Sequence, residues 1–316
     1  MNPIISFVNY LQSQQTAQSY LCHCYTQLKL PDPEAKSYEN CNAFIYYLNH
    51  GNRFYQQGRK SDPFMQPILY FYGMVHFIKA CLLTKRPNYP ESTNLLAHGV
   101  TARKRKKKDY TFMNDEVKVQ HNGLFPYFSE HLYEQTIPFE KRSMKHLLAV
   151  IPEMNQLFQF QGEHKMVPVG KQYSKLLEFP AHLLDSYHLT DTAFIRRIQP
   201  YLPNIKYYDY DDRMIRMEVT DPVKKVTGPF FVHSSTEQLF FPLKREDYLS
   251  IHEVMVHYLI LYNLSMLCRY ETEWWGDLFV AKPDIDYPFI LYFLELTSTK
   301  MPLLLGENLY DQRKKL

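Results

Sequence analysis

Apolar and polar positions follow a helical period over much of the chain. Ile4, Val8 and Leu11 share one face of a predicted N-terminal helix. Two further helices are predicted over residues 38–57 and 64–84. The helix over 64–84 is apolar almost all round, which is typical of a helix in the centre of a bundle.

The pattern changes between residues 163 and 243. Short aromatic or β-branched runs there are separated by turn residues, which predicts a small antiparallel sheet packed on helices. One helix, capped by Thr190, is expected among these strands. A shorter hairpin is predicted near residues 109–120, with its turn at Asn114 and Asp115.

These patterns predict an α+β fold. It is mainly a helical bundle, with a short hairpin and a small antiparallel β region inserted before the C-terminal helices. We expect a single unit over 1–316, in which the helices of 244–316 pack back on the helical part at 1–160. The β-rich part is 163–243.

The composition also indicates the cellular compartment. The five cysteines are scattered and odd in number, which indicates a reducing cytosol and not a disulfide framework. No basic segment precedes an apolar one at the N-terminus, so no signal peptide is predicted. The most apolar stretches are interrupted by His, Lys, Glu or Asn and are interpreted as core helices, without a membrane span. The sequence therefore predicts a cytoplasmic protein.

The formal net charge is +3, and a single run of six basic residues at 103–108 accounts for the whole excess of positive charge. Without its six cations the balance is 3 − 6 = −3, so a general nucleic-acid-binding face is not expected. The run lies between a Gly99 helix stop and the predicted hairpin. It is interpreted either as a solvated connector or as a loop that contacts an acidic partner protein. Its residues are Arg103, Lys104, Arg105, Lys106, Lys107 and Lys108.

Several common chemistries are excluded by enumeration. No two of the ten glycines are closer than seven positions, so neither a dinucleotide-binding loop nor a P-loop can be present. The G-x-S-x-G and S-x-x-K signatures of serine nucleophiles do not occur. Cys22 and Cys24 have no second pair, and His252 and His257 are five residues apart, off one helix face. No metal and no cofactor is therefore predicted.

Polar or aromatic side chains on or near almost wholly apolar helices are the candidate binding residues. They are His76, Lys79, His98, Arg269 and Trp274. One interpretation is a structural network in which Lys79 or Arg269 pairs with a carboxylate such as that of Glu271 or Glu273. The other is a pocket whose cations and rings bind an anionic or aromatic ligand such as a nucleotide.

A catalytic alternative rests on Arg245 and His252. They are separated by six residues, which fits the R-x₄₋₆-H motif of RNA-cleaving HEPN domains. In such a nuclease the His acts as acid or base and the Arg stabilises charge on the phosphate. Their position near a helix start also fits two solvated residues of a first turn.

Four blocks together resemble the YaaC-like family of bacterial proteins. They are YFYGMVHFIKACLL (70–83), NLLAHGV (94–100), VQHNGLF (119–125) and MVHYLILYNLSMLCRYETEWW (255–275). The resemblance implies a cytosolic protein of Gram-positive bacteria. Because some members are encoded beside inosine-monophosphate dehydrogenase, it also implies a link to purine metabolism, with that enzyme as a possible partner. It supplies no catalytic residue.

The function expected from the sequence is that of a non-catalytic, cytosolic protein-binding or regulatory factor linked to purine nucleotide metabolism. The reason is that strong catalytic signatures are missing from an aromatic-rich chain with a localised basic run. The alternative is a HEPN-like protein that handles nucleotides or RNA, including a ribonuclease.

Overall fold

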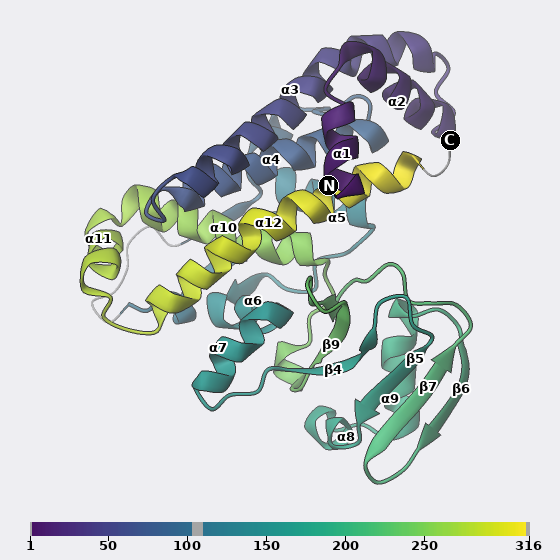
Figure 1. Ribbon diagram of the computed structural model, residues 1–316, viewed down its shortest axis with the longest axis vertical. Helices are drawn as coiled ribbons and strands as arrows, with labels where there is room; N and C mark the ends of the chain where they lie inside the picture. Colours follow the sequence, from purple (N-terminus) through teal and green to yellow (C-terminus); the bar gives the residue numbers. More distant parts are fainter. Residues whose placement is uncertain (1, 103–109, 314–316) are drawn as a thin grey trace. The chain divides into compact units, whose positions relative to one another are not determined.

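The computed structural model describes residues 2–102 and 110–313 of the chain. The chain divides into two compact units, Met1–Arg142 with His257–Leu316, and Ser143–Val256. The mainly helical α+β class predicted from the sequence is confirmed (Figure 1). The expectation that the whole chain behaves as a single unit stays a prediction. The predicted contact loop Arg103–Lys108 lies outside the described residues.

The first unit is built mainly from helices. They are α1 (Pro3–Tyr10), α2 (Gln14–Gln27), α3 (Pro33–Lys60), α4 (Gln66–Lys85), α5 (Leu124–Tyr133), most of α10 (Glu253–Tyr270), α11 (Thr272–Ala281) and α12 (Asp286–Arg313), with short 3₁₀ turns η1 (Thr93–Leu96) and η2 (Phe112–Asn114). Helix α12 runs beside α1 and α4, so the C-terminal end of the chain packs against its N-terminal helices (Figure 1).

Helices α3 and α4 form the closest pair in this unit. Asp32 caps α3 by accepting a hydrogen bond from the backbone N–H of Ala35 at 3.0 Å. Gly73 on α4 lies against the Tyr55 ring, and a Cβ there would be only 2.8 Å from Tyr55 Cδ2. The predicted helices over 38–57 and 64–84 are therefore both present. Helix α3 extends beyond both predicted limits, whereas α4 starts two residues later and ends one residue later than predicted.

Helices α4 and α12 are long and apolar enough to cross a membrane. However, 72% of the apolar window of α4 and 56% of that of α12 are buried inside the protein. Such burial is typical of core helices in a folded unit, in agreement with the interpretation of the helix over 64–84 as a central helix.

The predicted hairpin near 109–120 is wrong in its first strand. Residues Phe112–Asn114 form η2, because the Asp286 carboxylate accepts hydrogen bonds from the backbone N–H groups of Phe112 and Met113. The second strand exists as β2 (Glu116–Val119), but it pairs antiparallel with β1 (Val100–Ala102). A third strand, β3 (Lys141–Ser143), completes the small sheet in the order β1-β2-β3.

The second unit contains a six-stranded antiparallel sheet in the order β6-β7-β5-β4-β9-β8 (Figure 1). The strands are β4 (Met166–Lys171), β5 (Leu176–Pro180), β6 (Ile205–Tyr210), β7 (Met214–Val219), β8 (Phe231–Val232) and β9 (Gln238–Pro242). The helices are α6 (Met144–Ala149), α7 (Asn155–Phe160), α8 (His182–Tyr187) and α9 (Asp191–Ile198), with the 3₁₀ turns η3 (Pro152–Met154), η4 (Gln199–Tyr201) and η5 (Arg245–Asp247).

This unit has an apolar core of its own. Phe179 and Phe241 on the sheet pack edge to face, and both also contact Phe194 of α9. Thr190 caps α9 as predicted, accepting from the Ala193 N–H at 3.3 Å. The helix expected to start at residue 244 begins instead at Glu253, because η5 and an extended segment occupy the residues before it.

Candidate functional site

Two of the predicted binding residues, His76 and Lys79, lie one turn apart on α4 against aromatic side chains of α3. The His76 ring stacks on Phe54 with centroids 5.6 Å apart and an interplanar angle of 16°. His50 meets the His76 ring edge-on at 5.1 Å. The Lys79 ammonium lies 5.7 Å from the centre of the Tyr47 ring. The two helices therefore present one continuous row of rings and cations.

The row continues to a third predicted residue, His98. Tyr72 of α4 lies between Phe54 and His98, with ring centroids 6.3 and 6.0 Å away. On its other side His98 contacts Tyr262 of α10 at 5.8 Å. The His98 carbonyl accepts a hydrogen bond from the Tyr258 hydroxyl at 2.9 Å, which fixes this segment against α10. Side chains from α3, α4, α10 and the segment before β1 thus meet on one side of the first unit.

The fourth predicted residue, Arg269, lies in the last turn of α10. Its Nε donates a hydrogen bond to the Ser265 carbonyl at 2.9 Å, and its guanidinium lies 5.3 Å from the centre of the Tyr270 ring. Burial and, to a smaller extent, the positive charge of Arg269 lower the pKa of His98. We call these side chains the cationic aromatic face. The face consists of Tyr47, His50, Phe54, Tyr72, His76, Lys79, His98, Tyr262 and Arg269.

The electrostatics of the face follow from partial burial of like-charged groups. Burial, the His50 imidazole and the Lys79 ammonium lower the pKa of His76 to about 4. Burial, the Arg269 guanidinium and Lys79 lower the pKa of His98 to about 4. Burial also lowers the pKa of Lys79. At neutral pH both histidines are therefore uncharged, and Lys79 and Arg269 carry the positive charge of the face.

No acidic side chain neutralises this charge within residues 2–102 and 110–313. Neither Lys79 nor Arg269 forms an ion pair there, and the expected pairing of Arg269 with Glu271 or Glu273 is not formed. The Arg269 guanidinium instead bonds to Ser265 within its own helix. A half-buried cation that lacks a carboxylate is costly, and an external anion removes that cost.

Trp274, the fifth predicted binding residue, lies apart from the face. Its ring contacts are with Tyr110 at 4.9 Å and with Trp275 at 6.4 Å. It belongs to α11, which starts after the chain has turned at Glu271. Trp274 is therefore close to Arg269 in the sequence but forms its ring contacts elsewhere.

Sequence reasoning missed the aromatic part of the face. The missed residues are Tyr47, His50, Phe54, Tyr72 and Tyr262. A signal was available, since 47, 50 and 54 on α3 and 72, 76 and 79 on α4 have the three- and four-residue spacing of one helical stripe. The contact between the two stripes depends on the tertiary packing of α3 against α4.

The alternative catalytic pair is not held on one helix. Arg245 is exposed at the start of η5, whereas His252 directly precedes α10. The His252 Nδ1 accepts a hydrogen bond from the Val254 backbone N–H at 3.2 Å, which is a capping role. Burial lowers the pKa of His252 to about 3, so the ring is neutral near pH 7. The pair therefore lacks the arrangement within a helix that the HEPN motif requires.

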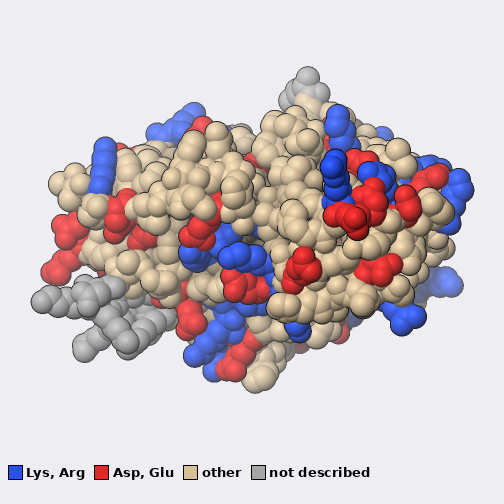
Figure 2. Space-filling model, turned by 90° about the horizontal axis from the view of Figure 1, so that it is seen from below, with Lys and Arg blue, Asp and Glu red and all other residues tan. Residues whose placement is uncertain are grey.

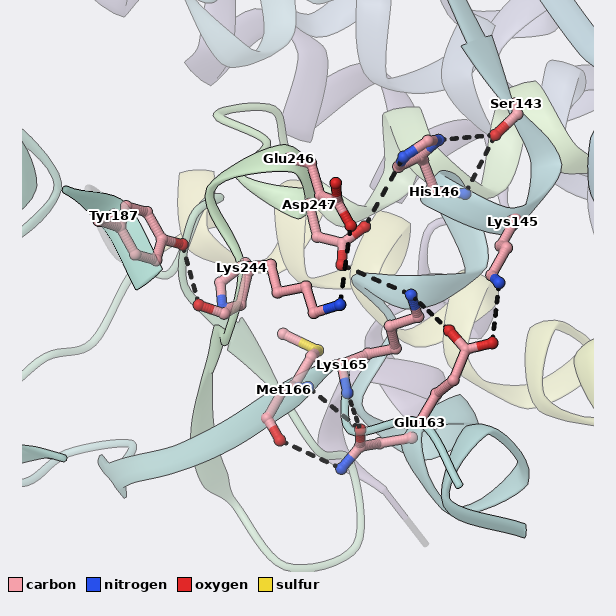
Figure 3. A network of polar contacts seen from close by, with 12 residues as sticks. Ser143, Lys145, His146, Glu163, Lys165, Met166, Tyr187, Lys244, Glu246 and Asp247 are labelled. Carbon is pink, nitrogen blue, oxygen red and sulfur yellow. Dashed lines mark hydrogen bonds and ion pairs between the residues drawn. The ribbon is translucent and has the colours of Figure 1, made fainter. Parts of the chain in front are cut away.

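A polar network surrounds η5 in the second unit. Figure 3 shows the buried Asp247 between His146 and Lys165, with its carboxylate oxygens 4.0 Å from His146 Nε2 and 3.8 Å from Lys165 Nζ. Lys165 also pairs with Glu163 at 2.8 Å, and Glu163 with Lys145 at 2.8 Å. The alternating charges join η5 to α6 and to the segment before β4, so we interpret the network as structural.

Ser143 in Figure 3 lies at the start of the short helix α6, where it is the N-cap. The Ser143 hydroxyl lies 2.7 Å from His146 Nδ1, and it accepts a hydrogen bond from the His146 backbone N–H. Both contacts belong to the cap of the short helix α6. In the described part of the chain, no group of three or more His, Cys, Asp or Glu side chains is arranged to hold a metal ion.

Comparison with known proteins gives one match. The family described as YaaC-like Protein matches residues 9–309, which is nearly the whole chain. Among curated proteins and among solved structures no match is found. The match spans both units and includes all nine residues of the cationic aromatic face. The chain therefore belongs to the YaaC-like protein family.

Proposed function

We propose that this chain is a cytosolic, non-catalytic regulatory protein that binds an acidic segment of a partner protein through the cationic aromatic face. The observation that carries the proposal is the pair of half-buried cations, Lys79 and Arg269, that lack a carboxylate in the described part of the chain. Aromatic rings and arginine are the residues that contribute most at protein interfaces.

The charge distribution favours a localised contact over a general nucleic-acid surface. On the face of the molecule that Figure 2 shows, Lys and Arg side chains are interleaved with Asp and Glu. The net charge of +3 is small for a chain of 316 residues. A partner is then recognised by a few fixed cations, and its binding should weaken with salt.

The link to purine nucleotide metabolism comes from the family. Members encoded beside inosine-monophosphate dehydrogenase make this enzyme the first partner to test. The five cysteines are free thiols, which supports the reducing cytosol in this proposal. A protein that regulates by binding a partner needs no catalytic motif, and the sequence contains none of the strong catalytic signatures.

The test compares two charge-removing double variants. Lys79→Met with Arg269→Met deletes both cations of the face while keeping side-chain bulk. Lys60→Met with Arg196→Met deletes two exposed cations elsewhere and is the matched control. Binding to purified inosine-monophosphate dehydrogenase is measured by biolayer interferometry at two salt concentrations, and partners from bacterial lysate are identified by mass spectrometry.

We expect the face variant to weaken binding by roughly tenfold or more, and the control variant to weaken it less than threefold. Higher salt should weaken binding of the unmodified chain and have little effect on the face variant. Equal binding by all three proteins would remove the face from the proposal. Absence of any stoichiometric protein partner would remove the regulatory function itself.

A second candidate function is nucleotide binding at the same face. It is favoured by the parallel stack of His76 and Phe54 near the Lys79 cation. A purine ring stacks on such rings, and a phosphate binds to such a cation. An absorbance ratio at 260 and 280 nm shows whether purified protein retains a nucleotide. Phe54→Leu, which removes the stacking ring but neither cation, should weaken nucleotide binding.

A further inference from the structure

A cavity of about 620 Å³, about half open to solvent, lies in the first unit and shares no residue with the cationic aromatic face. It is lined by residues of α1 and α2, by the turn between them, and by the last residue of α12, Arg313. Cavities of this size hold small organic ligands in other proteins. The question is what chemistry its walls recognise.

Three of the seven lining residues carry aromatic rings. Phe7 of α1 meets the buried Tyr20 ring edge-on at 5.6 Å and lies 6.4 Å from Tyr10, at an interplanar angle of 23°. Leu11 also belongs to the lining but has no exposed surface, so it supports the wall and is not open to a ligand. Tyr10 itself is 62% exposed, so one wall of the cavity carries an uncovered ring. Such walls favour a flat apolar body.

Arg313 supplies a positive charge at one side. Its guanidinium lies 4.3 Å from the centre of the Tyr310 ring and 5.9 Å from that of Phe7. In the described ranges it forms no ion pair with an acidic side chain. A guanidinium stacked on rings keeps its planar N–H edge for a bidentate anion, and carboxylate is the anion whose two oxygens match it.

The hydroxyl groups of the lining complete this picture. The Thr16 hydroxyl is already used, since it donates to the Tyr10 carbonyl at 2.5 Å. Ser19 forms no hydrogen bond with its side chain inside the described ranges, so its hydroxyl is available. Arg313 is the single cationic side chain of the described lining, which suits a ligand with one negative charge.

We propose that this cavity binds a small aryl carboxylate, with its ring against the exposed Tyr10 and Phe7 and its carboxylate on Arg313. Bound ligand connects α1 and α2 to the end of α12, so it stabilises the fold of the first unit. The site shares no residue with the face that the proposed function uses, and either can fail without the other.

The test uses 3-phenylpropionate as probe, its neutral amide 3-phenylpropanamide, and octanoate as a carboxylate without a ring. Affinities for the full chain are measured by ligand-observed NMR titration. Arg313→Gln removes the charge, and Ser19→Trp fills the cavity from an exposed helix position. Arg196→Gln, at an exposed arginine of α9, is the matched control.

We expect saturable binding of phenylpropionate, about tenfold or more tighter than binding of the amide and of octanoate. Arg313→Gln should lose about tenfold, Ser19→Trp should lose binding, and Arg196→Gln should bind as the unmodified chain does. The proposal is overturned if phenylpropionate does not saturate, or if Arg313→Gln binds it equally. Equal binding of the amide would refute the role of charge, and equal binding of octanoate would refute the aromatic class. The comparison of the three probes on the unmodified chain stands even if a variant fails to fold.

Discussion

At the residue scale, the half-buried imidazoles of the cationic aromatic face couple stability to pH. The folded-state pKa values of His76 and His98 are about 4, below the ordinary value of 6.5. Between these values the unfolded chain binds protons that the folded chain does not. Stability from these two groups is therefore complete above about pH 6.5 and is lost as the pH falls towards 4.

The prediction is a difference between two proteins, because other groups titrate in the same range. Burial raises the pKa of Asp286 to about 6, which acts with the opposite sign, and His252 acts with the same sign. We expect His76→Gln with His98→Gln to lose less melting temperature between pH 7 and pH 4.5 than the unmodified chain. Thermal scans at five pH values measure this. Parallel pH curves for the two proteins would contradict the neutral state of the two rings.

The site shows which residues can be predicted from sequence and which cannot. His76, Lys79 and Arg269 can be chosen from the sequence because a polar group on an apolar helix is conspicuous, whereas His98 lies in the segment before β1. The structure brings His76, Lys79 and His98 into one row of ring contacts. Trp274 is close to Arg269 in the sequence. However, Arg269 belongs to α10 and Trp274 to α11, a separate helix that starts at Thr272. The aromatic residues of α3 could not be assigned to the site from the sequence, because the local sequence does not show which helix packs against them.

At the scale of elements, the packing of α3 on α4 depends on glycine at the contact. A Cβ on Gly73 would lie 2.8 Å from Tyr55 Cδ2 and 3.1 Å from Phe54 Cβ. Phe54 also carries the stack on His76. The distance between the two helices, and with it the geometry of the face, is therefore limited by this small residue.

We predict that Gly73→Ala lowers the free energy of unfolding by about 1–3 kcal/mol, because the helices must separate to admit the methyl group. Gly276→Ala in α11 is the matched control, since no atom lies within 4 Å of its Cβ position. There alanine should raise stability by about 0.5–1 kcal/mol through its helix propensity. Urea unfolding of both variants measures the two changes, and a stabilising Gly73→Ala would contradict the close contact.

Elements with a strong period were predictable, and elements fixed by distant groups were not. The apolar period identified α3 and α4, and Thr190 marked the start of α9. The prediction of the hairpin is wrong because the Asp286 carboxylate, far along the chain, accepts hydrogen bonds from the backbone N–H groups of Phe112 and Met113 and holds them in a turn. The start of α10 was displaced because the residues before it form η5, whose Asp247 is buried beside Lys165.

At the scale of the whole molecule, the open question is whether the two units unfold together. Each has its own core, and the boundary between them at Val256 and His257 falls inside the continuous helix α10. A helix interrupted at that point would lose the hydrogen bonds that span it. The sequence-based expectation of a single unit therefore has a physical reason that calorimetry can test.

We predict a single transition in differential scanning calorimetry, with equal calorimetric and van't Hoff enthalpies. The decisive variant is Phe179→Ala, which removes a fully buried ring from the core of the second unit and should cost about 3–5 kcal/mol. If the units are coupled through α10, the whole transition moves to lower temperature as one peak. If they are independent, a new peak separates at lower temperature, and the peak of the first unit stays at its original temperature.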